Sequence, residues 1–87
     1  MKLIDGVVLT KLQEETVAVA VGEAAKRFKG MIKLNETAAF LATLLKQEQS
    51  EEGLVEALLR EYDVEREVAA RNVRYVIEQL SLIGLIE

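Results

Sequence analysis

The first third of the chain alternates apolar residues with polar or small ones, the period of two that is typical of β-strands. Residues 6–13 are rich in Val, Leu and Thr, the Glu pair at 14–15 predicts a polar turn, and valines alternate with alanines at 17–21. These two segments predict a hairpin. The charged stretch at 22–30, bracketed by two glycines, predicts a loop or bulged turn. Residues 31–34 then predict a third strand.

The remainder of the chain has the spacing of three and four between apolar positions that is typical of helices. It predicts helices over about 35–47, from near residue 50 to 62, and over about 65–83, with a break at 47–50 and a tight corner at 63–64. Asn35 is the expected N-cap of the first helix, and the second opens near Ser50. Gly84 is placed to be the left-handed residue that ends the third, with Leu85 folded back on its last turn.

This order predicts an α+β, winged-helix-like fold in which a three-stranded antiparallel sheet precedes three helices. A chain of 87 residues with 51% hydrophobic content is large enough for one core and too short for two domains. We therefore expect residues 1–87 to form a single domain, with Phe28 folded back over the core.

The composition excludes most catalytic chemistry. The chain has no Cys and no His, so it has no thiolate nucleophile, no imidazole base and none of the ligands that most zinc, copper or non-haem iron sites require. It also has no Gly-rich phosphate loop and no calcium-loop pattern of acidic residues. We expect a protein that is not an enzyme and that has no metal site and no cofactor.

Targeting signals are also missing from the sequence. No apolar run approaches the length of a membrane span, and the first five residues lack the basic start and apolar core of a signal peptide. These observations predict a cytoplasmic protein without a membrane partner.

The junction at 31–38, where a predicted strand runs directly into a helix start, is the leading candidate for a binding edge. A strand at the edge of a sheet has unpaired N–H and C=O groups, which an extended peptide can satisfy. Met31, Ile32, Lys33 and Leu34 form this candidate edge.

Basic residues gather around this edge although the protein is acidic overall. The stretch 24–35 contains basic residues and no acid, and the third helix adds three arginines; the residues are Lys26, Arg27, Lys29, Lys33, Arg66, Arg71 and Arg74. They can steer an acidic peptide toward the edge. The alternatives are that the lysines only protect an exposed edge from aggregation, and that Arg71 and Arg74 pair with Glu67 and Glu78, four residues away on the same helix.

Two other classes of function remain open from the pattern alone. A winged helix is often a DNA reader, but the net charge of −4 and the acidic stretch at 48–65 oppose phosphate binding, and we expect no nucleic-acid partner. A free strand edge can also pair with a second copy in an oligomerisation or adaptor module. The sequence leaves the oligomeric state open.

Four segments, taken in order, resemble the PqqD-like family: Leu-Asn-Glu-Thr-Ala-Ala-Phe-Leu at 34–41, Leu-Val-Glu-Ala-Leu-Leu at 54–59, Glu-Tyr-Asp-Val at 61–64 and Gly-Leu-Ile-Glu at 84–87. The resemblance implies a peptide chaperone, also called a recognition element for ribosomally synthesised and later modified (RiPP) peptides. Such a domain binds the leader segment of a precursor peptide and presents it to a maturase, often a radical S-adenosylmethionine (SAM) enzyme.

The resemblance also implies where the leader binds. The leader adds as a further antiparallel strand along 31–34, and its side chains enter a groove against the third helix. It makes Val73 and Ile77 candidates for the groove floor, with Ala70 beside them on the same helix. The charge distribution adds Lys29, Arg66, Arg71 and Arg74 as candidate contacts.

Overall fold

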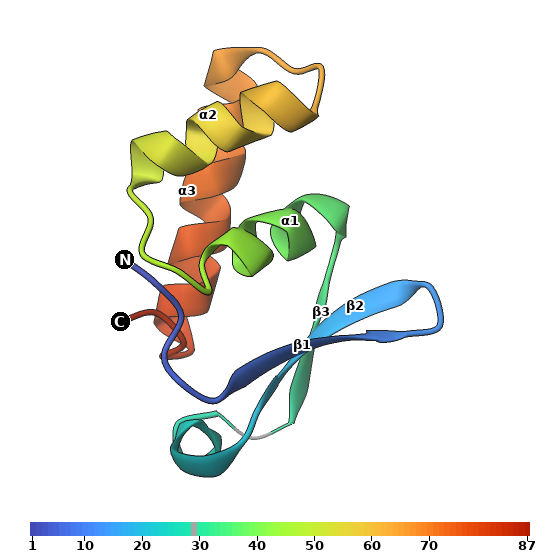
Figure 1. Ribbon diagram of the computed structural model, residues 1–87, viewed down its shortest axis with the longest axis vertical. Coiled ribbons are helices and arrows are strands. Elements are labelled where there is room, and N and C mark those ends of the chain that lie inside the picture. The colour runs from blue at the N-terminus through green and yellow to red at the C-terminus, as the bar shows by residue number, and fades with distance from the viewer. Residues whose placement is uncertain (29) are drawn as a thin grey trace.

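The computed structural model describes residues 1–28 and 30–87. Figure 1 shows a small sheet below a group of helices, with the two chain ends close together. The elements in chain order are β1 (Val7–Leu12), β2 (Glu15–Ala20), the short 3₁₀ helix η1 (Gly22–Lys26), β3 (Met31–Leu34), α1 (Glu36–Leu44), α2 (Glu51–Glu61) and α3 (Arg66–Leu82). The predicted α+β order of three antiparallel strands followed by three helices is confirmed.

The hairpin of β1 and β2 turns one residue earlier than predicted. Leu12 pairs with Glu15, so the turn residues are Gln13 and Glu14. Gln13 has a φ of 60°, the conformation that the first residue of a two-residue hairpin turn adopts. The sequence-based prediction did not place Gln13 in the turn because non-glycine residues rarely adopt positive φ.

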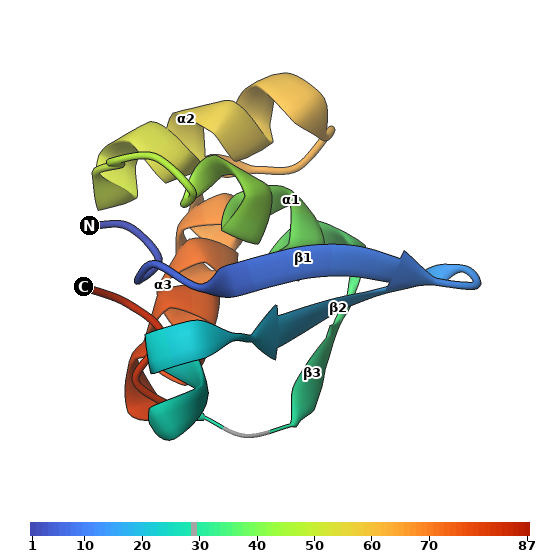
Figure 2. The same ribbon diagram turned by 60° about the horizontal axis from the view of Figure 1, so that its bottom comes forward.

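Part of the predicted loop between β2 and β3 is helical. Residues 22–26 form η1, which buries the side chain of Ala24. Phe28 packs against the core, as predicted. The chain then enters β3, which pairs with β2 alone among the described residues and therefore lies at the edge of the sheet. Figure 2 shows the three strands side by side with the helices on one face.

Helix α1 begins as predicted and ends earlier. The Asn35 side chain accepts a hydrogen bond of 2.8 Å from the Ala38 N–H, which caps the first turn. The helix ends at Leu44 rather than near residue 47 because the N-terminal segment bonds to the backbone that follows. The Leu3 N–H donates to the Leu45 carbonyl, and the Gln49 N–H donates to the Met1 carbonyl, each at 2.8 Å.

The core lies where the three helices and the two chain ends meet. Its largest fully buried side chains outside the sheet are Leu41, Leu45, Leu54, Leu58, Val73 and Leu85. Gly84 has a φ of 81°, and the Leu85 N–H donates to the Leu80 carbonyl at 2.9 Å, so the predicted left-handed end of α3 is confirmed. Ile86 then forms a bridge with Leu3.

The longest helix, α3, has 17 residues. Among the described residues, no helix is both long and apolar enough to cross a membrane.

Candidate functional site

A groove lies between the edge strand and the last helix. Its volume is about 450 Å³. One wall comes from β3 and its surroundings and consists of Phe28, Ile32, Lys33, Leu34, Asn35 and Ala38. The other wall comes from the C-terminal half of α3 and the residue after it, and includes Tyr75, Val76, Gln79, Leu80 and Ile83. The groove is therefore mostly apolar, with a few polar groups at its rim.

The hydrogen-bond register of the sheet decides which backbone groups of β3 are free. Opposite residues in an antiparallel pair alternate between hydrogen-bonded and non-bonded pairs. Leu12 and Glu15 close a two-residue turn, and at the other end the Val21 N–H donates to the Gly6 carbonyl at 2.7 Å. Odd-numbered residues of β2 therefore bond to β1, and its even-numbered residues face β3.

The same alternation continues into β3. Ala18 lies opposite Ile32, and Thr16 lies opposite Leu34, so Ile32 and Leu34 direct their N–H and C=O groups at β2. The corresponding groups of Met31 and Lys33 point away from the sheet. Within the described part of the chain, neither residue has a backbone hydrogen bond outside the sheet. Two residues of β3 thus present free donors and acceptors beside the groove.

Side chains of β3 alternate between the two faces. Ile32 and Leu34 are half-buried and line the groove on the helix-facing side. The side chains of Met31 and Lys33 are directed to the opposite, outer face, where Met31 is 55% exposed, and Lys33 also contributes to the groove lining at the strand edge. A strand added at this edge would place alternate side chains in the groove and on the outer face.

The structure brings together only some of the residues expected from the sequence. Met31, Ile32, Lys33 and Leu34 form the edge and wall described above. Lys29 lies outside the described residues. On α3, Val73 is fully buried in the core, and Ile77 lines a separate shallow cavity. Arg66, Ala70 and Arg74 line a third hollow together with Glu51, Glu52 and Val55 of α2.

The arginines of α3 do not pair as the sequence spacing suggested. Arg74 Nη2 donates to Glu51 Oε2 at 2.9 Å, and Arg66 Nη2 donates to Glu56 Oε2 at 2.7 Å, so both partners come from α2. The hydrogen bond to Glu51 raises the pKa of Arg74 above its ordinary value. Among the described residues, Arg71 forms no ion pair. Pairing with Glu67 or Glu78 is therefore not observed.

Sequence reasoning missed the α3 side of the groove. Tyr75, Val76, Gln79, Leu80 and Ile83 follow one another at intervals of one, three, one and three residues, which places them on a single helical stripe. That spacing could have identified the stripe. It could not have identified its partner, because the approach of β3 to the C-terminal half of α3 is a tertiary relationship.

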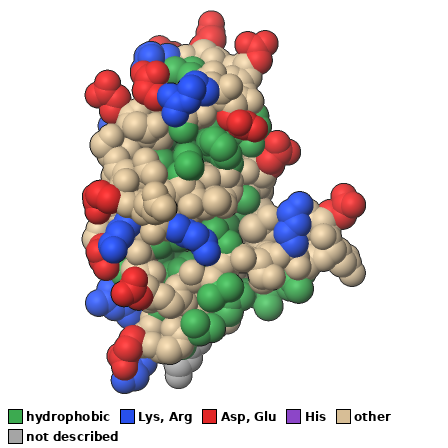
Figure 3. Space-filling view, in the orientation of Figure 1, with side chains coloured by type: hydrophobic (Ala, Val, Ile, Leu, Met, Phe, Trp, Pro, Cys, Tyr) green, Lys and Arg blue, Asp and Glu red, His purple; other side chains and the backbone are tan. Residues whose placement is uncertain are grey.

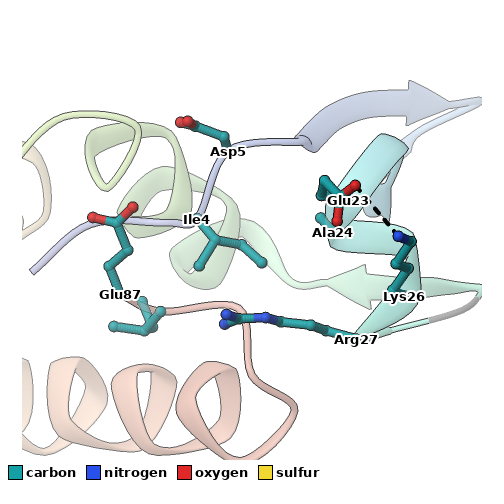
Figure 4. A pocket seen from close by; sticks show the side chains of 8 residues that line it. Ile4, Asp5, Glu23, Ala24, Lys26, Arg27 and Glu87 are labelled. Carbon is teal, nitrogen blue, oxygen red and sulfur yellow. Dashed lines mark hydrogen bonds and ion pairs between the residues drawn. The ribbon is translucent and has the colours of Figure 1, made fainter.

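A second cavity, of about 740 Å³, lies between η1 and the chain ends. Figure 4 shows Arg27 extended toward the segment that carries Glu87, and Lys26 bonded to Glu23 at 3.4 Å. Asp5 adds a third acid to its lining. None of its lining residues belongs to β1, β2 or β3, and its mixed charges define no single kind of ligand. No group of three or more potential metal-ligating side chains occurs among the described residues.

Comparison with known proteins decides the family. The family model described as coenzyme PQQ synthesis protein D (PqqD) matches residues 7–86, almost the whole chain. The chain belongs to the PqqD family. No curated protein matches it.

Two solved structures have folds similar to that of this chain. A structure of TbiB1 in complex with the TbiA(beta) leader peptide has 25% sequence identity and a TM-score of 0.78, and the match covers 100% of this chain and 95% of that one. A lasso peptide synthetase B1 complexed with the leader peptide has 23% identity and a TM-score of 0.73, over 97% of this chain and 93% of that one. Because the sequence identity is lower, the similarity to the lasso peptide synthetase B1 is evidence for the fold alone. Both similarities confirm the α+β fold of the PqqD-family chain.

Proposed function

We propose that this PqqD-family chain is a non-catalytic chaperone that binds the leader segment of a ribosomally synthesised precursor peptide by strand addition. The free main-chain groups of Met31 and Lys33 beside an apolar groove are the observation that carries the proposal. The family membership and the leader-peptide complexes of similar structures support it.

The proposed contacts follow from this geometry. The leader pairs antiparallel with β3, since the whole sheet is antiparallel and such pairing is slightly more stable per residue than parallel pairing. Side chains of the leader that face the groove contact Ile32 on one wall and Val76 and Leu80 on the other. Tyr75 and Gln79 form the exposed rim. The main chain supplies affinity, and the groove supplies selectivity.

The partner enzyme is part of the proposal. A domain that holds a leader presents the following core segment to a maturase, a radical SAM enzyme or another modifying enzyme. We propose that residues 1–87 act as one recognition domain in this step, in the cytoplasm, where ribosomes make the precursor.

Two proline substitutions test the proposed edge. The probe is a set of fluorescein-labelled peptides that correspond to the N-terminal segments of short reading frames encoded beside this chain. Lys33→Pro removes an amide that faces the peptide, and we expect affinity to fall about tenfold, the upper end of the effect of one hydrogen bond. Lys11→Pro is the matched control, because Lys11 is also a lysine on an edge strand with its amide turned away from β2.

The outcome is read by fluorescence anisotropy after circular dichroism has shown that both variants fold. Equal affinity of Lys33→Pro, Lys11→Pro and the unmodified chain would exclude β3 as the peptide site. Binding of none of the peptides to the unmodified chain would reject the leader-binding function itself.

The alternatives make different predictions for the same protein. A DNA reader would use the arginines of α3 on phosphates, but Arg66 and Arg74 are already paired with acids of α2. Retardation of a DNA duplex at low salt, lost as salt rises, would support that alternative. Pairing of β3 edges between copies would make the sedimentation coefficient depend on concentration.

A further inference from the structure

The outer face of the sheet carries a row of apolar side chains that ends at the proposed peptide edge. Val8, Val19 and Met31 lie opposite one another across the three strands. Val8 is 43% exposed and Met31 is 55% exposed. Figure 3 shows hydrophobic side chains along the lower border of the sheet, on the side turned away from the helices. The two ends of this row are therefore open to solvent.

The next row across the same face is different in character. Thr10, Val17 and Lys33 lie opposite one another, and the Lys33 side chain is 73% exposed. Its ammonium is 3.6 Å from the Glu15 carboxylate, an exposed pair of the kind that contributes little to stability. Lys33 is therefore available to a second acid that approaches from the open side of β3.

The register fixes which peptide residues meet these two rows. Met31 and Lys33 have the free main-chain groups, so the peptide residues that bond to them lie directly opposite and share their outer face. The peptide residue between them lies opposite Ile32 and faces the groove. In an antiparallel strand the residue opposite Lys33 comes first, and the residue opposite Met31 comes last.

We propose that the β3 edge selects a peptide with three consecutive residues of defined chemistry: an acidic residue opposite Lys33, an apolar residue in the groove opposite Ile32, and an apolar residue opposite Met31. This inference rests on the proposed function and specifies its substrate class. The acid pairs with the Lys33 ammonium across the strands. The last apolar residue extends the row of Val8, Val19 and Met31 by one strand, and such cross-strand pairs are favourable.

Selection from a displayed library of random decapeptides tests the inference and does not require the natural ligand. The immobilised full chain is compared with Lys33→Glu and with Lys11→Glu, a control that reverses an exposed lysine of β1, on the opposite edge of the sheet. We expect the unmodified chain and Lys11→Glu to enrich the sequence acidic, apolar, apolar. We expect Lys33→Glu to enrich Lys or Arg at the first of these positions.

A reciprocal titration measures the size of the effect. The best peptide selected on the unmodified chain is synthesised with its acid or with Lys at that position. We expect the acidic peptide to bind the unmodified chain roughly three- to tenfold more tightly than the Lys peptide, and the preference to reverse with Lys33→Glu. Lys33→Gln, which removes the charge without reversing it, is expected to abolish the preference and serves if Lys33→Glu does not fold.

The outcomes separate this inference from the proposed function. Enriched peptides without an acidic preference, or with the same preference on Lys33→Glu, overturn the inference and leave strand addition in place. A library that yields no peptide above the level of blank beads overturns both. Enrichment of the three-residue pattern with the expected charge switch supports both.

Discussion

Arg74 donates two hydrogen bonds to one carboxylate oxygen of Glu51, from Nη2 at 2.9 Å and from Nε at 3.3 Å. The contact joins α3 to α2 on the side where Arg66 pairs with Glu56. The groove beside β3 is instead lined by Tyr75, Val76, Gln79, Leu80 and Ile83. Helix α3 therefore has two structurally distinct sides, an ion-paired side against α2 and a groove side that faces β3.

This division predicts how substitutions on α3 affect peptide affinity. We expect the double variant Arg71→Glu plus Arg74→Glu to bind a selected peptide within about twofold of the unmodified chain, because Arg74 lies on the ion-paired side and neither arginine lines the groove. We expect Tyr75→Ala to weaken binding several-fold, because Tyr75 lines the groove and is 63% exposed. Fluorescence anisotropy titrations measure the peptide affinity of both variants and of the unmodified chain. A larger loss for the arginine variant would move the site to the α2 side.

The cap of α1 predicts a loss of stability that depends on chemistry rather than size. Asn35→Ala removes the acceptor for the Ala38 N–H and should lower the free energy of unfolding by about 1 kcal/mol. Asn35→Asp retains an acceptor of similar capping strength and should stay close to the unmodified chain. Urea unfolding followed by circular dichroism measures both. Equal losses for the two variants would show that the side-chain acceptor at residue 35 does not account for the stability of this helix start.

Substitution of a core residue of α2 should lower the free energy of unfolding by more than loss of the α1 cap does. Leu58 is 1% exposed and belongs to the cluster that joins the three helices. Leu58→Ala should lower the free energy of unfolding by about 2–5 kcal/mol through the lost contacts and the cavity that remains. Leu82→Ala is the control, since Leu82 is 80% exposed, and should change it by less than about 0.5 kcal/mol. Similar urea midpoints for the two variants would contradict the packing described above.

Tyr62 gives the fold a pH dependence in the alkaline range. Partial burial, followed by the charge of Glu36, raises the pKa of Tyr62 above its ordinary value of 10.0. The unfolded chain then loses this proton at lower pH than the folded chain, so stability declines as pH rises above about 10 and through the folded pKa. Below about pH 10 this contribution is complete.

The comparison with Tyr62→Phe isolates that contribution from the other groups that titrate at high pH. Phe keeps the edge-on contact with Phe40, whose ring centroid lies 5.7 Å from that of Tyr62. We expect the difference in free energy of unfolding between the two chains to shift against the unmodified chain as pH rises above about 10, the ordinary pKa of a tyrosine. A difference that is constant over this range would show that Tyr62 titrates alike in both states.

Local sequence patterns were sufficient to predict most of the strands and helices. Alternation and helical spacing predicted the strands and helices, Asn35 and Ser50 predicted two helix starts, and Gly84 predicted the end of α3, because each of these features is decided within a few residues. Features that depend on distant partners were predicted less well. The end of α1 is set by bonds from the N-terminal segment to Leu45 and Gln49.

The same distinction applies to the site. Local alternation and one side-chain acceptor are enough to predict that Met31, Ile32, Lys33 and Leu34 form a strand that leads directly into a capped helix. The three-dimensional packing of the chain places this strand at the sheet edge, turns the amides of Met31 and Lys33 outward, and puts Tyr75 rather than Arg74 on the groove side of α3. Helical spacing defines a stripe of residues, but which stripe meets the sheet depends on how the three helices pack on one another, and that packing joins residues far apart in the sequence.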